Sequence, residues 1–377
     1  MRKRFAALLG FLLFASLDTI AASAGLETSV ERAQAMLIRE DLGEGIYLFR
    51  APSDLDYWTA TNSVVIINDD DVLVFDSCTR AVTARAVIAE IRKLTAKPVR
   101  TLINSHWHQD HWSGNSEYAK AFPGIRIVST AQTRDFMAHM RPEFFVQEMY
   151  DFGLTRMEEG LANAIATGNL ADGSPLTALA RAGMEHGISL AKQFVAEIEA
   201  NPRVLPNMVF QDESTLWSGR REMRLMNFTG DATASTVLYL PGEKVVVTGD
   251  VLVSPEDGSG PPPWSTNSHS VSSWLDGLRR LDSMDVRAIV PGQGPVMHDK
   301  AYLRRTIELF DAIRRQVLAA LDRGHVKFAD VRASVNVDDI AQTFAGKDKI
   351  DKDFNLVVDL LVKRIMQESL DQSASLE

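Results

Sequence analysis

Cysteine is nearly missing from this chain, in which Cys78 is the only one among 377 residues. A single thiol cannot form an intramolecular disulfide, so the fold has to be held by its core, and a chain of this length can bury a large one. At the end of an expected strand, a lone cysteine is typical of a small buried apolar residue rather than of a reactive thiol. The composition, 45% hydrophobic and 24% charged, fits one large domain or two closely packed ones.

Basic residues are also few, because 40 lysines and arginines stand against 50 aspartates and glutamates, which gives a formal net charge of −10. A chain with this charge repels nucleic acid and acidic membrane surfaces, so we expect no nucleic-acid partner. Low-complexity stretches and short-period repeats are missing too, which argues against a repeat architecture.

The apolar run at the N-terminus is too short to span a bilayer comfortably. It extends from Phe5 to Leu17, follows three basic residues and precedes Ala22-Ser23-Ala24. This order predicts a secretory signal peptide over residues 1–24, and a periplasmic or secreted protein with no stable membrane insertion after cleavage. Cleavage before Gly25 would remove three basic residues and one acidic residue, which moves the formal net charge from −10 to −12.

Two strand-rich blocks, around residues 45–130 and 208–292, make up most of the remaining pattern. Short apolar runs predict strands in the first block at Ile46–Phe49, Ser63–Asn68, Val72–Asp76, Val99–Ile103 and Ile125–Ser129, with a helix at Ala81–Ala96. The second block is expected to hold strands within 208–228 and at 236–240, 244–248 and 287–290, with a helix at 270–281. Two similar halves that face each other predict an α/β fold, a four-layer αββα sandwich.

Two helical segments accompany these blocks. The first is an insertion of about residues 132–205, with a break near 168–175, and the second is a C-terminal extension over residues 299–377. Apolar residues in the insertion, such as Phe136 and Met137, fit either a lid over a pocket or ordinary core. The C-terminal extension holds no chemical motif, and we expect it to pack against the rest of residues 25–298 and to offer a surface for a homo-oligomer.

Histidine is scarce as well, with eight in the chain, yet three of them lie within six positions of the stretch NSHWHQDHWSGN. This stretch leaves the carboxyl end of an expected buried strand, where ligand sites of open α/β sheets lie. Residues two apart on an extended segment point the same way, so His106 and His108 can bind one ion. After the chain turns, Asp110 and His111 can bind a second one. Imidazole with carboxylate suits zinc, and manganese or iron(II) as alternatives, which predicts one or two bound ions.

His-Trp-His-Gln-Asp-His after a helix and a hydrophobic strand resembles the HxHxDH loop of the metallo-β-lactamase superfamily. Three further segments are similar to this family: the strand that ends in Asp76, the stretch VVVTGD that ends in Asp250, and the turn Pro291–Gly294. The resemblance implies an αββα sandwich with a dinuclear site at one edge. It also implies that Asp76 supports the loop and that Asp250 bridges two ions.

Two positions depart from the family pattern. Asp231 stands where the family has a histidine ligand of the first metal, and Gln293 replaces the last histidine of the second site. The ligand sets expected from the resemblance are therefore His106, His108 and Asp231 for one ion, and Asp110, His111 and Asp250 for the other. Asp231 also fits a turn aspartate. Gln293 fits a role in backbone geometry or in substrate binding, and His269 and His298 remain alternative ligands.

The resemblance implies attack by a metal-bound hydroxide on a carbonyl-type bond, with Asp110 orienting the nucleophile. The chain contains no GxSxG motif, so the sequence gives no sign of a serine nucleophile. The tryptophans of expected site loops predict a small amphipathic substrate rather than phosphate or sulfate, which would call for arginines. We expect Trp58, Trp112, Trp264 and Gln293 to contact this substrate, whereas a place in the core fits Trp58 and Trp107 equally well.

Export and acidity argue against the tRNA-processing and cytosolic thioester-hydrolysing members of the family. An ester, a lactone or a β-lactam therefore remains as the expected substrate. The alternative is a family member that has lost catalysis and binds a ligand or a partner, because two of the usual histidines are replaced.

Overall fold

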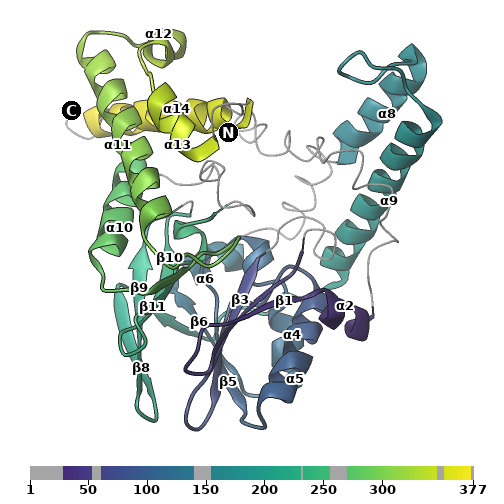
Figure 1. Cartoon of the computed structure of the whole chain (residues 1–377), viewed down its shortest axis with the longest axis vertical. Helices are drawn as coiled ribbons and strands as arrows, with labels where there is room; N and C mark the ends of the chain where they lie inside the picture. The colour runs from purple at the N-terminus through teal and green to yellow at the C-terminus, as the bar shows by residue number, and fades with distance from the viewer. Residues whose placement is uncertain are drawn as a thin grey trace.

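Two β-sheets face each other in the computed structural model, with helices on both outer sides (Figure 1). The structure describes residues 29–52, 61–139, 154–230, 232–254, 270–345 and 352–374. The predicted signal peptide over residues 1–24 lies outside these ranges. In the described part of the chain, no helix is long and apolar enough to cross a membrane.

The first sheet has seven strands in sequence order: β1 (Ile38–Asp41), β2 (Ile46–Arg50), β3 (Asn62–Ile67), β4 (Val72–Phe75), β5 (Val99–Ile103), β6 (Arg126–Thr130) and β7 (Met208–Phe210). The first four pair antiparallel, as expected from the turns between them, and β4 to β7 pair parallel. The expectation that residue 208 opens the second block is wrong in one respect, because β7 pairs with β6 and closes the first sheet.

The second sheet has five strands in the order β12, β11, β10, β9, β8. Their bounds are β8 (Glu213–Ser218), β9 (Arg221–Phe228), β10 (Ser235–Leu240), β11 (Val245–Val247) and β12 (Ala288–Val290). Only β11 and β12 pair parallel in this sheet, and the connection between them contains α10 (Val271–Ser283). The carboxyl ends of β11 and β12 therefore lie side by side.

Apolar residues divide the molecule into four layers. Between the sheets, residues such as Val64, Phe75 and Leu238 form one core cluster. On the outer face of the first sheet, α4 (Ala81–Leu94) and α5 (Asn115–Ala121) bury residues such as Ile88 and Tyr118. On the outer face of the second sheet, α10 and the C-terminal helices bury a third cluster. These layers confirm the predicted αββα sandwich.

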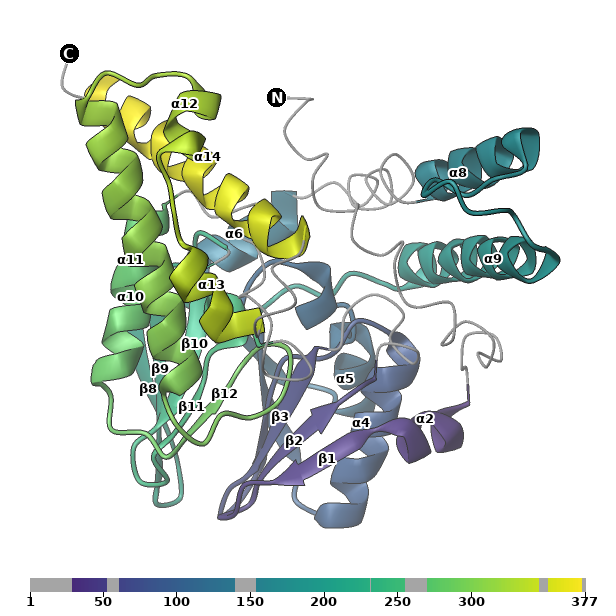
Figure 2. The same ribbon diagram turned by 45° about the horizontal axis from the view of Figure 1, so that its top comes forward.

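The helical insertion leaves the sandwich after β6. Its described helices are α6 (Ala131–His139), α8 (Thr155–Thr167) and α9 (Ala178–Ala200). Helices α8 and α9 lie side by side and project away from the sheets (Figure 2). The end of α9 is tied to the sandwich, because the buried guanidinium of Arg80 forms two 2.7 Å bonds with the carboxylate of Glu197.

The C-terminal helices are α11 (Ala301–Asp322), α12 (Phe328–Ala333), α13 (Asp338–Ala345) and α14 (Lys352–Ala374). They share one apolar core with α10 and the second sheet. Glu368 of α14 reaches the amino end of α10, where its carboxylate accepts bonds from Val271 N and from the backbone and hydroxyl of Ser272. A carboxylate at this end satisfies free N–H groups of the helix, so α14 fixes the start of α10. A short helix, α2 (Val30–Met36), packs on α4.

Candidate metal centre

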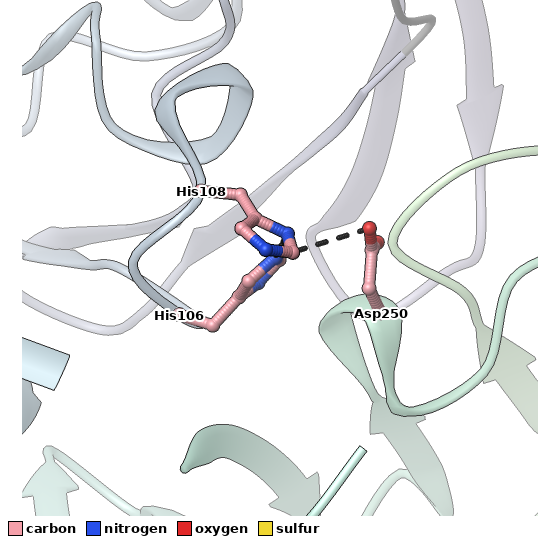
Figure 3. Close-up of side chains that lie close together, drawn as sticks. All are labelled: His106, His108 and Asp250. Atoms are coloured by element: carbon pink, nitrogen blue, oxygen red, sulfur yellow. Dashed lines mark hydrogen bonds and ion pairs between the residues drawn. The ribbon is translucent and has the colours of Figure 1, made fainter. Parts of the chain in front are cut away.

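Four loops at the same edge of the two sheets bring the candidate residues together. Asp76 follows β4, the histidine loop follows β5, Asp250 follows β11, and the turn at residues 291–294 follows β12. Figure 3 shows His106 and His108 facing Asp250 across the gap between the two halves. Segments about 140 positions apart in the sequence therefore meet because parallel strands end at the same edge.

The first ligand set comprises His106, His108 and Asp250, each with one ligand atom, and these atoms lie within 4.8 Å of one another. Nε2 of His106 lies 3.9 Å from Oδ2 of Asp250 and 2.7 Å from Nδ1 of His108. The His106 side chain is fully buried. Two imidazoles and a carboxylate at this spacing can hold zinc or a first-row neighbour.

The second ligand set comprises Asp110, His111 and again Asp250. Nε2 of His111 lies 3.1 Å from Oδ2 of Asp110 and 3.4 Å from Oδ2 of Asp250. This nitrogen is buried and has no hydrogen-bond partner among the described residues. An ordinary buried histidine forms hydrogen bonds through its ring nitrogens, but this nitrogen forms none with the described residues and faces two carboxylate oxygens. The three groups therefore fit the ligands of a metal ion.

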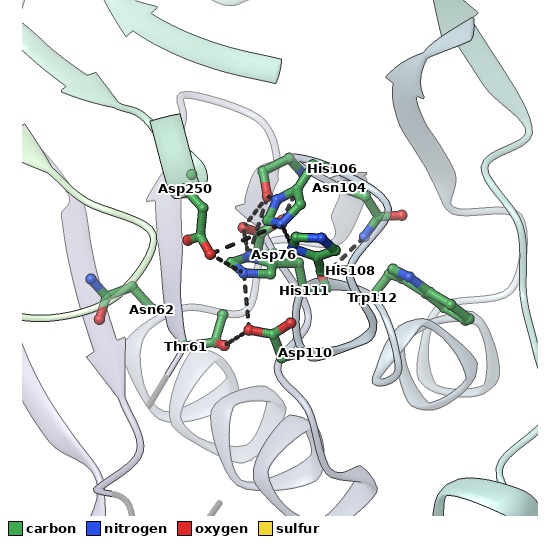
Figure 4. Close-up of polar contacts among 12 residues, drawn as sticks. Thr61, Asn62, Asp76, Asn104, His106, His108, Asp110, His111, Trp112 and Asp250 are labelled. Atoms are coloured by element: carbon green, nitrogen blue, oxygen red, sulfur yellow. Dashed lines mark hydrogen bonds and ion pairs between the residues drawn. The ribbon is translucent and has the colours of Figure 1, made fainter. Parts of the chain in front are cut away.

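Asp76 and Ser105 hold the histidines in place, and Figure 4 shows Asp76 beside His106 and His111. Asp76 Oδ2 accepts bonds from His111 Nδ1 and from the Ser105 hydroxyl, both at 2.7 Å, and Oδ1 accepts from Ser105 N at 2.7 Å. The Ser105 oxygen also lies 3.0 Å from Nδ1 of His106. Because Nδ1 of both rings is engaged, Nε2 of both rings is directed toward the candidate ligand sets. The implied support of the loop by Asp76 is therefore seen in the structure.

The charges around the site favour a cation. Burial alone would lower the pKa of His111, but Asp110, Asp250 and Asp76 raise it well above its usual value. Burial would raise the pKa of Asp110, yet the charges of His111 and His108 hold it far below its usual range. At His106, burial and the two neighbouring histidines lower the pKa, which leaves a neutral ring suited to ligation.

Gln293 closes the side of the second set nearest the second sheet. Its Nε2 donates to Oδ2 of Asp110 at 3.2 Å and to Oδ2 of Asp250 at 3.1 Å. Thr61 adds a hydroxyl bond to the same Asp110 oxygen at 3.0 Å. Thr61, Asn62 and Ser105 were not predicted as site residues, since a lone hydroxyl or amide carries no motif of its own. Of the three, only Ser105 had a signal in the sequence, its position next to His106.

Several predicted site residues are not placed by the structure. Asp231, Trp58 and Trp264, as well as the alternative ligand His269, lie outside the described residues. His298 is 64% exposed and its Nε2 lies 3.3 Å from Glu40. The structure therefore gives His298 a surface partner and no place in either ligand set.

The tryptophans of the loop differ in exposure. Trp112 is 3% exposed, donates its indole N–H to Trp107 O at 2.8 Å and lies under the guanidinium of Arg203. It supports the loop in this structure, and its contact with a substrate stays a prediction. Trp107 is partly exposed, with its ring centroid 4.4 Å from that of His108 and 5.8 Å from that of Phe136 on α6.

Comparisons with known proteins agree with this fold. Among curated proteins, the linear primary-alkylsulfatase of Pseudomonas sp. (strain ATCC 19151) is 21% identical over 269 residues, which cover 68% of this chain and 46% of that protein. This chain thus spans about half the length of that relative. A solved double mutant of the sec-alkyl sulfatase PisA1 is similar with a TM-score of 0.61 and 13% identity, over 94% of this chain and 54% of that one.

A metallo-β-lactamase from Pontibacter korlensis is similar over 72% of this chain and 98% of its own, at 14% identity and a TM-score of 0.48. The family model described as the metallo-beta-lactamase superfamily matches residues 56–293. This range contains the first strand block from β3 onward, the whole second block, the histidine loop, Asp250 and Gln293. The chain belongs to the metallo-β-lactamase superfamily.

Proposed function

We propose that this protein is a metal-dependent hydrolase that cleaves a carbonyl-type bond or a sulfate ester of a small amphipathic molecule. The observation that carries this proposal is the pair of ligand sets, His106, His108 and Asp250 with Asp110, His111 and Asp250, which share one buried carboxylate. Divalent ions bound there would polarise the scissile bond and lower the pKa of a bound water. Asp231 would complete the first set, as the sequence predicts.

Asp110 is the candidate for orienting the attacking water and accepting its proton. Its side chain is 14% exposed, two hydrogen bonds fix Oδ2, from the Thr61 hydroxyl and the Gln293 amide, and Nε2 of His111 lies 3.1 Å away. An oxygen held this firmly, with a low pKa, is ionised and prepared to accept a hydrogen bond from a water on its open side.

The substrate side is apolar and aromatic beside the first ligand set. Trp107 stacks edge-on against His108, and Phe136 extends this surface with 36% of its area exposed. An alkyl or aryl group that lies on these rings would place its ester bond next to His108, which supports an amphipathic substrate.

Two substrate classes follow from different observations. A sulfate ester of an alkyl alcohol is the first, because the relatives that match most of this chain are named as alkylsulfatases. A carbonyl-type bond, as in a carboxylate ester, a lactone or a β-lactam, is the second. It is favoured because Arg203, the cation packed on Trp112, donates to the Met137 carbonyl oxygen rather than standing open for a sulfate.

The test combines metal content with a substrate panel. The purified protein is analysed for metal and assayed with dodecyl sulfate, p-nitrophenyl sulfate, p-nitrophenyl butyrate, a homoserine lactone and a chromogenic cephalosporin. We expect bound divalent metal and turnover of one substrate class, lost in His106→Ala and kept in His298→Ala, since His298 is exposed and outside both sets. No metal and no turnover would instead support a ligand-binding protein that has lost catalysis.

We also propose that the mature protein is exported, on the strength of the basic and apolar pattern of residues 1–24. Expression of the full chain followed by fractionation and N-terminal sequencing tests this. We expect the protein in the periplasm or medium with Gly25 as its first residue. An intact N-terminus in the cytosol would contradict export and leave the proposed chemistry untouched.

A further inference from the structure

The two ligand sets differ in their donor atoms, and Gln293 makes the difference. The first set has two imidazole nitrogens and one carboxylate, from His106, His108 and Asp250. The second has one nitrogen, from His111, two carboxylates, and the Gln293 amide against both of them. If the Gln293 carbonyl oxygen is a ligand, it adds an oxygen to the second set only.

The turn that carries Gln293 is fixed rigidly against Asp250. Asn62 donates its side-chain N–H groups to Pro291 O at 2.8 Å and to Gly294 O at 2.9 Å, and its backbone N–H to Gly292 O at 2.8 Å. A side chain at Gly292 would begin 1.9 Å from Oδ1 of Asp250. Gln293 therefore reaches the two carboxylates from a backbone that has little room to retreat.

An amide can serve this position in two ways. Beside two carboxylates it presents its N–H group, as the structure shows, because its oxygen would repel theirs. Beside a cation, a half turn about the last side-chain bond presents the carbonyl oxygen instead. The ligand pattern would then be three oxygens and one nitrogen, which suits manganese or magnesium better than zinc, whereas the two imidazoles of the first set suit zinc.

We propose that Gln293 makes the second ligand set selective for a hard divalent ion such as Mn²⁺, while the first set binds zinc. This inference rests on the proposed metal binding and deepens it, because it assigns a different ion to each set. The Gln293 amide also donates hydrogen bonds to both Asp110 and Asp250, and so it holds the two carboxylates together before an ion binds. A histidine that serves only as a metal ligand would not link them in this way.

Metal titration of the chelator-treated full chain tests the proposal without reference to activity. We expect one tight zinc per chain, a second zinc that binds at least about tenfold more weakly, and one Mn²⁺ seen by electron paramagnetic resonance that zinc displaces poorly. Gln293→His is expected to create a second tight zinc site and to weaken Mn²⁺ by about tenfold or more. Gln293→Glu, with a carboxylate oxygen, is expected to tighten Mn²⁺.

Opposite shifts from two variants at one position cannot come from a folding defect, and Gln193→His on the exposed face of α9 controls for an added histidine. Two zinc ions of equal affinity in the unmodified protein, or metal preferences that neither variant changes, would overturn the inference alone. Absence of any tightly bound divalent ion would overturn the proposed function together with it.

Discussion

Oδ2 of Asp76 lies 2.7 Å from Nδ1 of His111, at a point where both side chains are fully buried. The carboxylate fixes which ring nitrogen carries the proton, and so it directs Nε2 toward Asp110 and Asp250. Burial raises the pKa of Asp76 despite the opposing charge of His111, so the ionised carboxylate is less stable at this buried position than it would be in water. Such a group is expected to serve the site rather than the stability of the fold.

Asp76→Asn is therefore expected to weaken metal binding by about 10- to 100-fold, since an amide orients His111 less strongly than a carboxylate does. Competition with a chromophoric chelator measures the affinity. Asp71→Asn is the control, because Asp71 precedes β4, at the end of the strand opposite to Asp76. In the part of the chain that the structure describes, its carboxylate accepts hydrogen bonds from Asn68 and Ser218 only. Equal losses in both variants would contradict this account.

Gly292→Ala tests the close packing of the β12 turn. The new methyl carbon would lie 1.9 Å from Oδ1 of Asp250 and 2.5 Å from Gly249 C, so the shared carboxylate has to move. A displacement of this size is expected to lower the rate about 100-fold. Gly242→Ala has nothing within 4 Å of its methyl carbon and should retain full activity. Steady-state kinetics of the two variants decide this, and normal turnover in Gly292→Ala would speak against a fixed position for Asp250.

Glu197→Gln tests the tie between α9 and the sandwich. Arg80 has a fully buried side chain, so removing the charge of its partner leaves a cation poorly compensated. We expect a loss of about 2 kcal/mol in the free energy of unfolding. Glu185→Gln breaks the exposed pair with Arg181 on the same helix and should change stability by less than about 0.5 kcal/mol. Urea titrations compare the variants, and equal midpoints would show that the buried pair contributes little.

The pH dependence of hydrolysis follows from the number of carboxylates. If Asp231 is a ligand beside Asp110 and Asp250, as the sequence predicts, two divalent ions would leave one net positive charge, where two carboxylates would leave two. The pKa of the attacking water should then lie above the value of about 7 that zinc-bound water has in good zinc hydrolases. The rate of hydrolysis should therefore rise into the alkaline range. Asp231→His combined with Gln293→His is expected to shift the profile to lower pH. An unchanged profile and metal content in this double variant would refute the argument.

The strand pattern predicted the sandwich, and the histidine spacing predicted four of the ligands, whereas Asp250 was implied only by the resemblance to the metallo-β-lactamase superfamily. The short apolar runs in β2 to β5 reflect burial that a sequence shows directly. His106, His108, Asp110 and His111 lie within six positions, so their proximity needed no knowledge of the fold.

Contacts between distant segments could not be predicted in this way. Asn62 holds the turn at residues 291–294, and Glu368 caps α10 from the end of α14, yet neither belongs to a motif. The exposure of Trp107 rather than Trp112 depends on how the loop turns after His108. The pairing of β7 with the first sheet depends on where the chain re-enters after the insertion. These features are set by tertiary packing, which local pattern does not encode.

The measurement that tests the central claim most directly is the metal content of Asp250→Asn. Because Asp250 belongs to both ligand sets, its loss should empty both, whereas His108→Ala should empty only the first. Elemental analysis after equilibration with zinc and manganese is expected to find about two ions per chain in the unmodified protein, fewer in His108→Ala, and almost none in Asp250→Asn, which should also lack hydrolytic activity. An Asp250→Asn protein that keeps both ions and its activity would contradict the shared carboxylate.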